Sequence, residues 1–336
     1  MFLMRNSQCL MRNYRDLRSA LYYNVWKRSF PNDYALRIAV FEVIYLYKQK
    51  LCLSASKSYG ISLPEQIRLF KKTGFEGFFV LWEKGMDEDI AECAKVAKEE
   101  NMIFQSIHAP WGYCQDMWDE NEKEDARKGV EELKHCLDLC KMFEVPVLVS
   151  HVFVGFDVEY KPTEFGLKNY GEVIDYAEEL GVKIAFENTE GLPYLKALFE
   201  RYGDRVAMGF CWDSGHEMCY NFSEDLLSLF GHKLYATHIN DNLGIKDFNG
   251  RIFWHDDLHL LPFDGIADWD YNAKRLQKCG YDGILTFELN KSSKPNRHEN
   301  DKYTKMSIEE YVTEAYCRAC RFASQIMRSA ECGMRN

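Results

Sequence analysis

From residue 51 onward, short apolar runs alternate with longer segments in which apolar residues recur at helical spacing. The short runs are rich in β-branched and aromatic residues, which is typical of parallel strands buried on both faces. They predict strands at 51–55, 77–81, 103–108, 147–151, 182–187, 206–213, 233–238 and 283–289. The longer segments predict helices at 64–73, 87–100, 122–143, 163–180, 193–202, 223–230, 268–279 and 307–327.

This strand-then-helix order predicts an α/β fold, a (β/α)8 TIM barrel that forms a single domain over residues 51–330. Glycine or proline marks the turns that lead from a helix into the next strand, for example at Gly74, Pro146 and Gly181. No G-x-G-x-x-G sequence follows the first strand, which argues against a dinucleotide-binding fold.

Residues 1–50 differ from the rest in charge. They hold nine Lys or Arg and three Asp or Glu, a net of +6, so the remainder carries −16 of a total of −10. We interpret them as a basic, helical N-terminal extension; the alternatives are a start codon placed too far upstream and a basic partner-binding arm. No apolar run reaches the roughly 20 residues of a membrane span. Twelve dispersed cysteines favour reduced thiols and a cytoplasmic location.

The chemistry that the sequence predicts lies at the ends of the predicted strands. The runs FQSIH, VLVSH, KIAFE, MGFCWD, LYATH and ILTFE each lead up to a histidine or a carboxylate. These six residues are His108, His151, Glu187, Asp213, His238 and Glu288. Because all strands of such a barrel open onto one mouth, we expect the six side chains to converge there. One strand-end histidine is usually an ordinary pocket residue, but six potential ligands at matching positions indicate a metal site.

Two further pairs strengthen this interpretation. Asp213-Ser-Gly-His216 places an imidazole just after a strand-end carboxylate, and Asp257-Leu-His259 places two ligand types on one side of an extended stretch. The mixture of imidazole and carboxylate ligands favours a divalent metal such as Zn, Mn or Co over Ca²⁺.

The phrases IAFENTEG, GFCWDSGHE, THINDN, DDLHLLPFDG and GILTFEL resemble the xylose isomerase-like TIM barrel superfamily. That superfamily contains sugar isomerases and epimerases and also DNA repair enzymes of the endonuclease IV type. In the sugar enzymes, one metal is held by Glu, Asp, His and Glu from the last four strands. The resemblance assigns these roles to Glu187, Asp213, His238 and Glu288, with His216 behind the ligands or in contact with substrate.

This resemblance implies an isomerase or epimerase that acts on a small sugar or sugar derivative through a metal-bound enediolate. A divalent ion would acidify the C–H between a carbonyl and its neighbouring hydroxyl. Glu187 and Glu288 are the expected pair for removing and returning a proton. The expected partner is therefore a small-molecule sugar, and relatives of this kind often form homo-oligomers.

The alternative is a zinc phosphodiesterase acting on abasic DNA. Repair enzymes of this superfamily use nine ligands for three zinc ions, and the chain contains every matching residue type. The matching residues are His108, His151, Glu187, Asp213, His216, His238, Asp257, His259 and Glu288. The chain is acidic overall and has no basic runs after the first two strands. Both features argue against a nucleic-acid partner. A third possibility is a degenerate barrel that only binds a ligand.

The substrate contacts are less well defined by the sequence. Trp111 follows the third strand and is suited to stacking on either a base or a sugar face. We expect Trp111 to line the pocket. Any of the nine possible ligands that does not bind a metal ion should line the same pocket. The sugar enzymes usually have Pro-Gly-x-Gly after the D-x-H element, whereas this chain has Pro262-Phe-Asp-Gly265. That departure leaves open whether the substrate is phosphorylated.

Overall fold

The structure is a computed structural model that describes residues 47–156, 158–245 and 252–333, with side chains up to residue 327. The chain divides into the units Met1–Leu46 and Tyr47–Asn336, and every described residue belongs to the second unit. The predicted basic extension at 1–50 therefore lies almost wholly outside the described residues. No described helix is long and apolar enough to cross a membrane.

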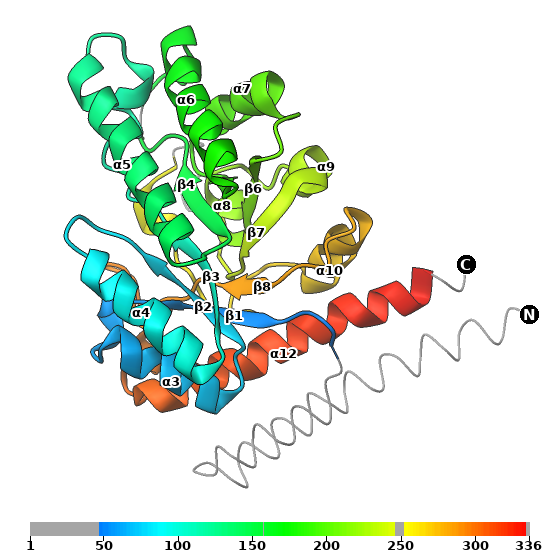
Figure 1. The fold of residues 1–336 in the computed structure, drawn as a ribbon. Helices are drawn as coiled ribbons and strands as arrows, with labels where there is room; N and C mark the ends of the chain where they lie inside the picture. The colour runs from blue at the N-terminus through cyan, green and yellow to red at the C-terminus, as the bar shows by residue number, and fades with distance from the viewer. Residues whose placement is uncertain (1–46, 157, 246–251, 334–336) are drawn as a thin grey trace, which may run out of the picture. The chain divides into compact units, whose positions relative to one another are not determined.

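Eight parallel strands form a nearly closed barrel (Figure 1). The strands are β1 Leu51–Ala55, β2 Gly77–Leu81, β3 Ile103–His108, β4 Val147–His151, β5 Lys183–Glu187, β6 Met208–Asp213, β7 Leu234–His238 and β8 Leu285–Phe287. Neighbours in space follow chain order, and β1 pairs with β8. Between β7 and β8 there is one isolated parallel bridge, from Ile239, which follows β7, to Phe287, so the barrel is nearly closed. The predicted (β/α)8 fold is therefore confirmed.

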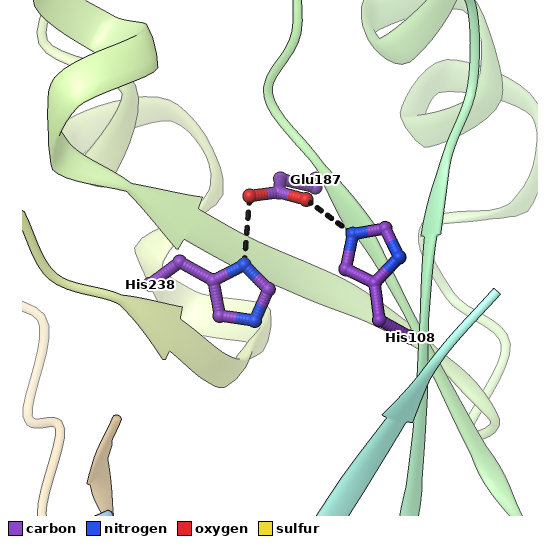
Figure 2. A group of neighbouring side chains, drawn as sticks. All are labelled: His108, Glu187 and His238. Carbon is purple, nitrogen blue, oxygen red and sulfur yellow. Dashed lines mark hydrogen bonds and ion pairs between the residues drawn. The ribbon is translucent and has the colours of Figure 1, made fainter. Parts of the chain in front are cut away.

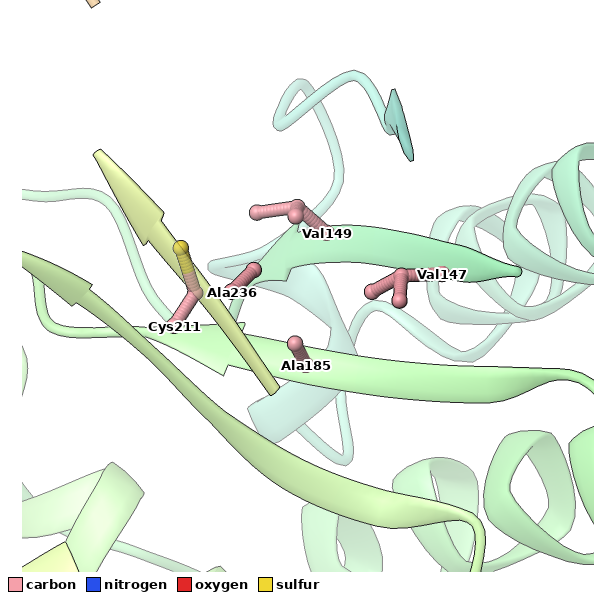
Figure 3. Close-up of a cluster of buried hydrophobic side chains, with 5 residues drawn as sticks. All are labelled: Val147, Val149, Ala185, Cys211 and Ala236. Atoms are coloured by element: carbon pink, nitrogen blue, oxygen red, sulfur yellow. The ribbon is translucent and has the colours of Figure 1, made fainter. Parts of the chain in front are cut away.

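The strands enclose a packed core of small side chains (Figure 3). Val147, Val149, Ala185, Cys211 and Ala236 come from four consecutive strands and are buried against one another. A barrel interior is filled by side chains rather than hollow, so it forms a floor under the mouth. The strand ends are consequently held at fixed positions.

Helices cover the outside of the barrel (Figure 1). The helices of the described residues are α3 Leu63–Thr73, α4 Asp87–Glu100, α5 Lys123–Met142, α6 Glu164–Leu180, α7 Leu192–Tyr202, α8 Ser214–Cys219, α9 Leu226–Phe230, α10 Trp269–Lys278, α11 Asp301–Thr304 and α12 Ile308–Gly333. The first of these begins with a capping box, in which Ser62 and Glu65 satisfy each other's backbone N–H groups. It ends at Gly74, where φ is 116° and a Cβ atom would lie 2.5 Å from the Tyr316 ring, so only glycine fits.

The predicted element boundaries hold within a few residues, with four differences. One is the last helix, which runs to Gly333 instead of ending at residue 327. The sixth strand begins at Met208 rather than Val206, whose side chain is exposed. The eighth strand spans only Leu285–Phe287, and the helix predicted at 223–230 forms only at Leu226–Phe230. The short helices α8 and α11 were not predicted, because neither is long enough to show helical periodicity.

Candidate metal centre

The strand ends bring the predicted ligands together at one mouth of the barrel. The register of the sheet places two pairs directly: His151 lies opposite Glu187 on β4 and β5, and Asp213 lies opposite His238 on β6 and β7. His108 ends β3, while Glu288 follows β8 by one residue. Because parallel strands carry their C-terminal ends to the same rim, these side chains point into one space.

Glu187 is the centre of this cluster, and its side chain is completely buried. Figure 2 shows its carboxylate between His108 and His238. One oxygen, Oε2, lies 3.1 Å from Nε2 of His108 and 3.1 Å from Nε2 of His151. The other oxygen, Oε1, lies 2.8 Å from Nδ1 of His238 and 3.6 Å from Nδ1 of His216. One carboxylate therefore joins four imidazoles.

Asp213 and Glu288 complete the inner group. Oε2 of Glu288 lies 2.9 Å from the same His238 Nδ1 that Glu187 approaches. Ligand atoms of Glu187, Asp213, His238 and Glu288 all lie within 4.8 Å of one another. Two carboxylates converging on one imidazole nitrogen form a compact arrangement of oxygen and nitrogen donors.

Polar side chains next to the ligands hold Asp213 in place. Asn188 follows Glu187; its amide donates to the backbone O of Asp213 at 2.9 Å and accepts from the backbone N at 2.8 Å. Asn240 donates to Asp213 Oδ2 at 2.8 Å, and the backbone N of His216 donates to Oδ1 at 2.6 Å. Asp213 is thus also the N-cap of α8, which fixes where His216 lies.

His216, Asp257 and His259 form an outer group beside the inner one. Oδ1 of Asp257 lies 2.7 Å from Nε2 of His259 and 3.4 Å from Nε2 of His216. Its other oxygen, Oδ2, accepts from Nζ of Lys294 at 3.3 Å. Asp213, His216 and His259 also have ligand atoms within 4.8 Å of one another, so Asp213 is within reach of both groups.

The residues fit a divalent cation. Nδ1 of His216 is buried and has no hydrogen-bond partner, yet it lies 3.6 Å and 3.9 Å from oxygens of Glu187 and Asp213. Nε2 of His238 and Nδ1 of His151 are likewise buried without a partner. A buried nitrogen such as Nδ1 of His216, which faces two buried carboxylates at these distances, is suited to sharing a cation with them. The donor set of nitrogen and oxygen matches zinc, manganese or cobalt.

The ionisation of the cluster reflects the competition between burial and neighbouring charge. Burial alone would raise the pKa of Glu187, but the His238 charge and the three imidazole contacts hold the pKa well below its usual value. Burial opposes ionisation of Glu288 as well, yet His238 and His259 lower its pKa to about 2. For Asp213 burial prevails and raises the pKa to about 6. Burial disfavours the charged form of His238, but the surrounding Cys211, Glu187 and Glu288 raise its pKa well above the ordinary value.

These shifts predict that metal affinity rises with pH. A cation must displace the proton that Asp213 binds below about pH 6, so affinity falls as the pH drops through that value. His238 still carries a proton above its ordinary pKa, so affinity continues to rise above pH 6.5. We expect about a tenfold change per pH unit for each proton displaced. Calorimetric titrations of metal-free protein with Mn²⁺ at several pH values measure this, and a pH-independent affinity would contradict it.

A cavity of about 670 Å³ opens above the cluster. Trp111, His108, His151, His216, Asp257, His259 and Glu288 line it, whereas Glu187, Asp213 and His238 lie beneath its surface. The Trp111 ring stacks on His151 with ring centroids 5.3 Å apart and is 42% exposed, so it offers a free aromatic face. Trp82, Phe153 and Trp212, in contrast, are buried in the packing.

Glu190 and Lys294 are charged residues of this cavity that were not singled out in the sequence. Glu190, which lies three residues after Glu187, lines the cavity; its Oε1 accepts from the backbone N of Gly155 at 2.6 Å. Burial raises its pKa to about 7. Lys294 lies after β8 and lines the opening as well. The sequence ENTEG contains Glu190, but no sequence pattern indicates that its side chain faces the cavity.

Fold and site together define a (β/α)8 barrel with a buried His, Glu and Asp cluster that resembles a metal site. The chain belongs to the family described as xylose isomerase-like TIM barrel, because the model of that family matches residues 67–311. A curated relative is "Uncharacterized protein y4fM" of Sinorhizobium fredii (strain NBRC 101917 / NGR234), which is 33% identical over 210 residues. That match covers 57% of this chain and 64% of the relative's length.

Solved structures share the fold at low sequence identity. The IolI protein, solved with a binding zinc atom, has a TM-score of 0.67 and 20% identity; the match covers 82% of this chain and 99% of that one. An L-ribulose 3-epimerase has a TM-score of 0.62 and 17% identity, covering 84% and 97%. A D-allulose 3-epimerase from Methylomonas sp., in complex with D-allulose, has a TM-score of 0.59 and 15% identity, covering 81% and 96%.

Proposed function

We propose that this chain is a metal-dependent isomerase or epimerase of a small sugar or sugar derivative. The observation that carries this proposal is that Glu187 and Glu288 both approach Nδ1 of His238, while only Glu288 also lines the cavity. Proton transfer next to a carbonyl needs two things here. One is a buried carboxylate that holds a cation, and the other is a second carboxylate that faces the substrate. The names of the similar structures, which include sugar epimerases, agree with this chemistry.

The carboxylates share metal binding in this proposal but differ in their access to the substrate. Glu187, Asp213, His238 and Glu288 hold the ion, which when bound polarises a substrate carbonyl and acidifies the neighbouring C–H. Glu288 takes that proton, because it lines the cavity and its side chain is 24% exposed. Glu187 is completely buried, so it contributes mainly as a metal ligand. For Glu187 also to transfer a proton, the substrate would have to reach it past the histidines that surround it.

Glu190 is suited to supply a proton on the substrate side. Its pKa of about 7 keeps a share of the side chain neutral at physiological pH. An ionised Glu288 and a partly protonated Glu190 in one cavity have the opposite protonation states that acid–base catalysis needs. Return of the proton to the same carbon from the other face gives epimerisation, and its return to the neighbouring carbon gives isomerisation.

The test uses exchange with solvent, which does not require the product to be known. Metal-loaded protein is incubated in D₂O with a panel of ketoses and aldoses, and deuterium incorporation at carbon is followed by NMR. We expect incorporation into at least one sugar, loss of it on chelation, and a drop of about 100-fold or more in Glu288→Gln. Glu179→Gln, an exposed change on α6, should match the wild type. Full exchange in Glu288→Gln would exclude Glu288 as the base.

The second candidate function is a zinc phosphodiesterase for abasic DNA. One observation favours it: the outer group places His216 and His259 around Asp257, beside the inner ligands and the His108 and His151 pair. Three adjoining ligand groups would suit three cations that clamp a phosphodiester. Chelator-sensitive cleavage of an abasic duplex, together with no sugar exchange, would favour this function over the first.

A further inference from the structure

The outer group differs from the inner group in its charge. The inner group has three carboxylates, Glu187, Asp213 and Glu288, and no ammonium group lies against any of them in the described residues. The outer group has one carboxylate of its own, Asp257, and the ammonium of Lys294 pairs with it. Because affinity for a divalent cation depends on the charge of the ligands, the two groups should bind cations very differently.

Lys294 is held in place from two sides. Its Nζ donates to Oδ2 of Asp257 at 3.3 Å and lies 5.5 Å from the centroid of the Trp254 ring. The lysine side chain is 21% exposed, and that of Asp257 is 13% exposed, so solvent screens the pair only partly. The ammonium contacts Oδ2 of Asp257, whereas His216 and His259 both contact Oδ1.

We propose that Lys294 stands in for a cation at the outer group and keeps His216, Asp257 and His259 free of a metal ion. A divalent ion held by these three residues would share the Asp257 carboxylate with the ammonium and be repelled by it. The ammonium instead supplies one positive charge and N–H donors at the cavity wall, suited to a substrate hydroxyl or carbonyl oxygen. The inference rests on the metal centre of the proposed function and favours it over three-metal phosphodiester chemistry.

The experiment counts metal ions and needs no substrate. Wild type, Lys294→Met and the control Lys291→Met are stripped with a chelator, reloaded with Zn²⁺, desalted and analysed for zinc per chain. Lys291 lies on the same segment, but its Nζ donates to the backbone O of Thr304, away from the cluster. We expect Lys294→Met to bind one zinc ion more than wild type, and Lys291→Met to match wild type.

Asp257→Asn locates the added ion. In the Lys294→Met background this change should return the zinc content to that of wild type, and in the wild-type background it should remove none. Equal zinc in wild type and Lys294→Met, or loss of an ion on Asp257→Asn alone, would overturn the proposal for Lys294 while leaving the inner metal centre intact. If none of the proteins takes up zinc, both the proposal and the metal centre fail. Lys294→Gln, which keeps a polar side chain, replaces Lys294→Met if circular dichroism shows the latter misfolded.

Discussion

Replacing Glu187 by Gln should remove both metal binding and turnover while leaving the barrel folded. The carboxylate contacts His108, His151 and His238 within 3.1 Å, so its loss takes a negative charge from the point where these imidazoles converge. The Gln amide is uncharged and has only one oxygen, so it cannot bind the cation and also accept hydrogen bonds from three ring nitrogens. We expect metal affinity to fall at least about 100-fold, and turnover to fall by about 10²–10⁴.

The measurements are zinc or manganese content after reloading, together with thermal unfolding in the presence of chelator. Added metal should raise the unfolding midpoint of the wild type but not that of Glu187→Gln. Glu179→Gln serves as the matched control, because it makes the same chemical change on an exposed position of α6. A variant that retains full metal content and activity would remove Glu187 from the site.

Replacing Arg275 by Met should destabilise the fold more than any surface change. The guanidinium of this α10 residue donates to both oxygens of Glu217 on α8, at 2.6 Å and 2.7 Å, and both side chains are buried. Glu217 also accepts from the Trp212 indole N–H at 3.0 Å and from the backbone N of Leu226 at 3.2 Å. Removing the arginine leaves a buried carboxylate without its counter-charge, which costs about 3–5 kcal/mol.

This pair also bears on the metal centre, since Glu217 follows His216 directly and Trp212 precedes Asp213. We therefore expect weaker metal binding along with the lower free energy of unfolding, as measured by urea denaturation. Arg127→Met is the control: Arg127 pairs with Glu172 on the surface and is 51% exposed, so its loss should cost only about 0–1 kcal/mol. Equal losses in the two variants would show that the buried pair has no special weight.

The sequence predicted most of the fold because the signals for the strands are local. Runs such as Val147–His151 and Ile103–His108 are buried, apolar and bounded by turns, and their predicted limits agree with the structure. Val206 looked like part of a strand, but its backbone N–H donates to Glu178 on α6 instead of continuing the ladder. The sequence Ser214–Cys219 has no helical period, and its helix depends on the cap that Asp213 provides.

The convergence of the strand-end residues was also predictable, because the barrel alone requires it. The division of labour within the site was not. Glu187 lies buried under imidazoles, whereas Glu288 faces the cavity. This difference depends on side-chain directions, which are set only by packing in the folded structure. Lys294 lies in an irregular segment, 37 positions away from Asp257 in the chain. No sequence pattern therefore predicts the contact between these two residues.

The pairing of His151 with Glu187, and of Asp213 with His238, ties the ligand geometry to strand length. Successive side chains of a strand alternate between the barrel interior and the helix layer, so losing a single residue from β5 or β6 would turn a ligand outward. Substitutions at the rim can change which molecule enters without disturbing this arrangement. Such a scaffold therefore tolerates new loops between its strands far better than any change in the strands themselves.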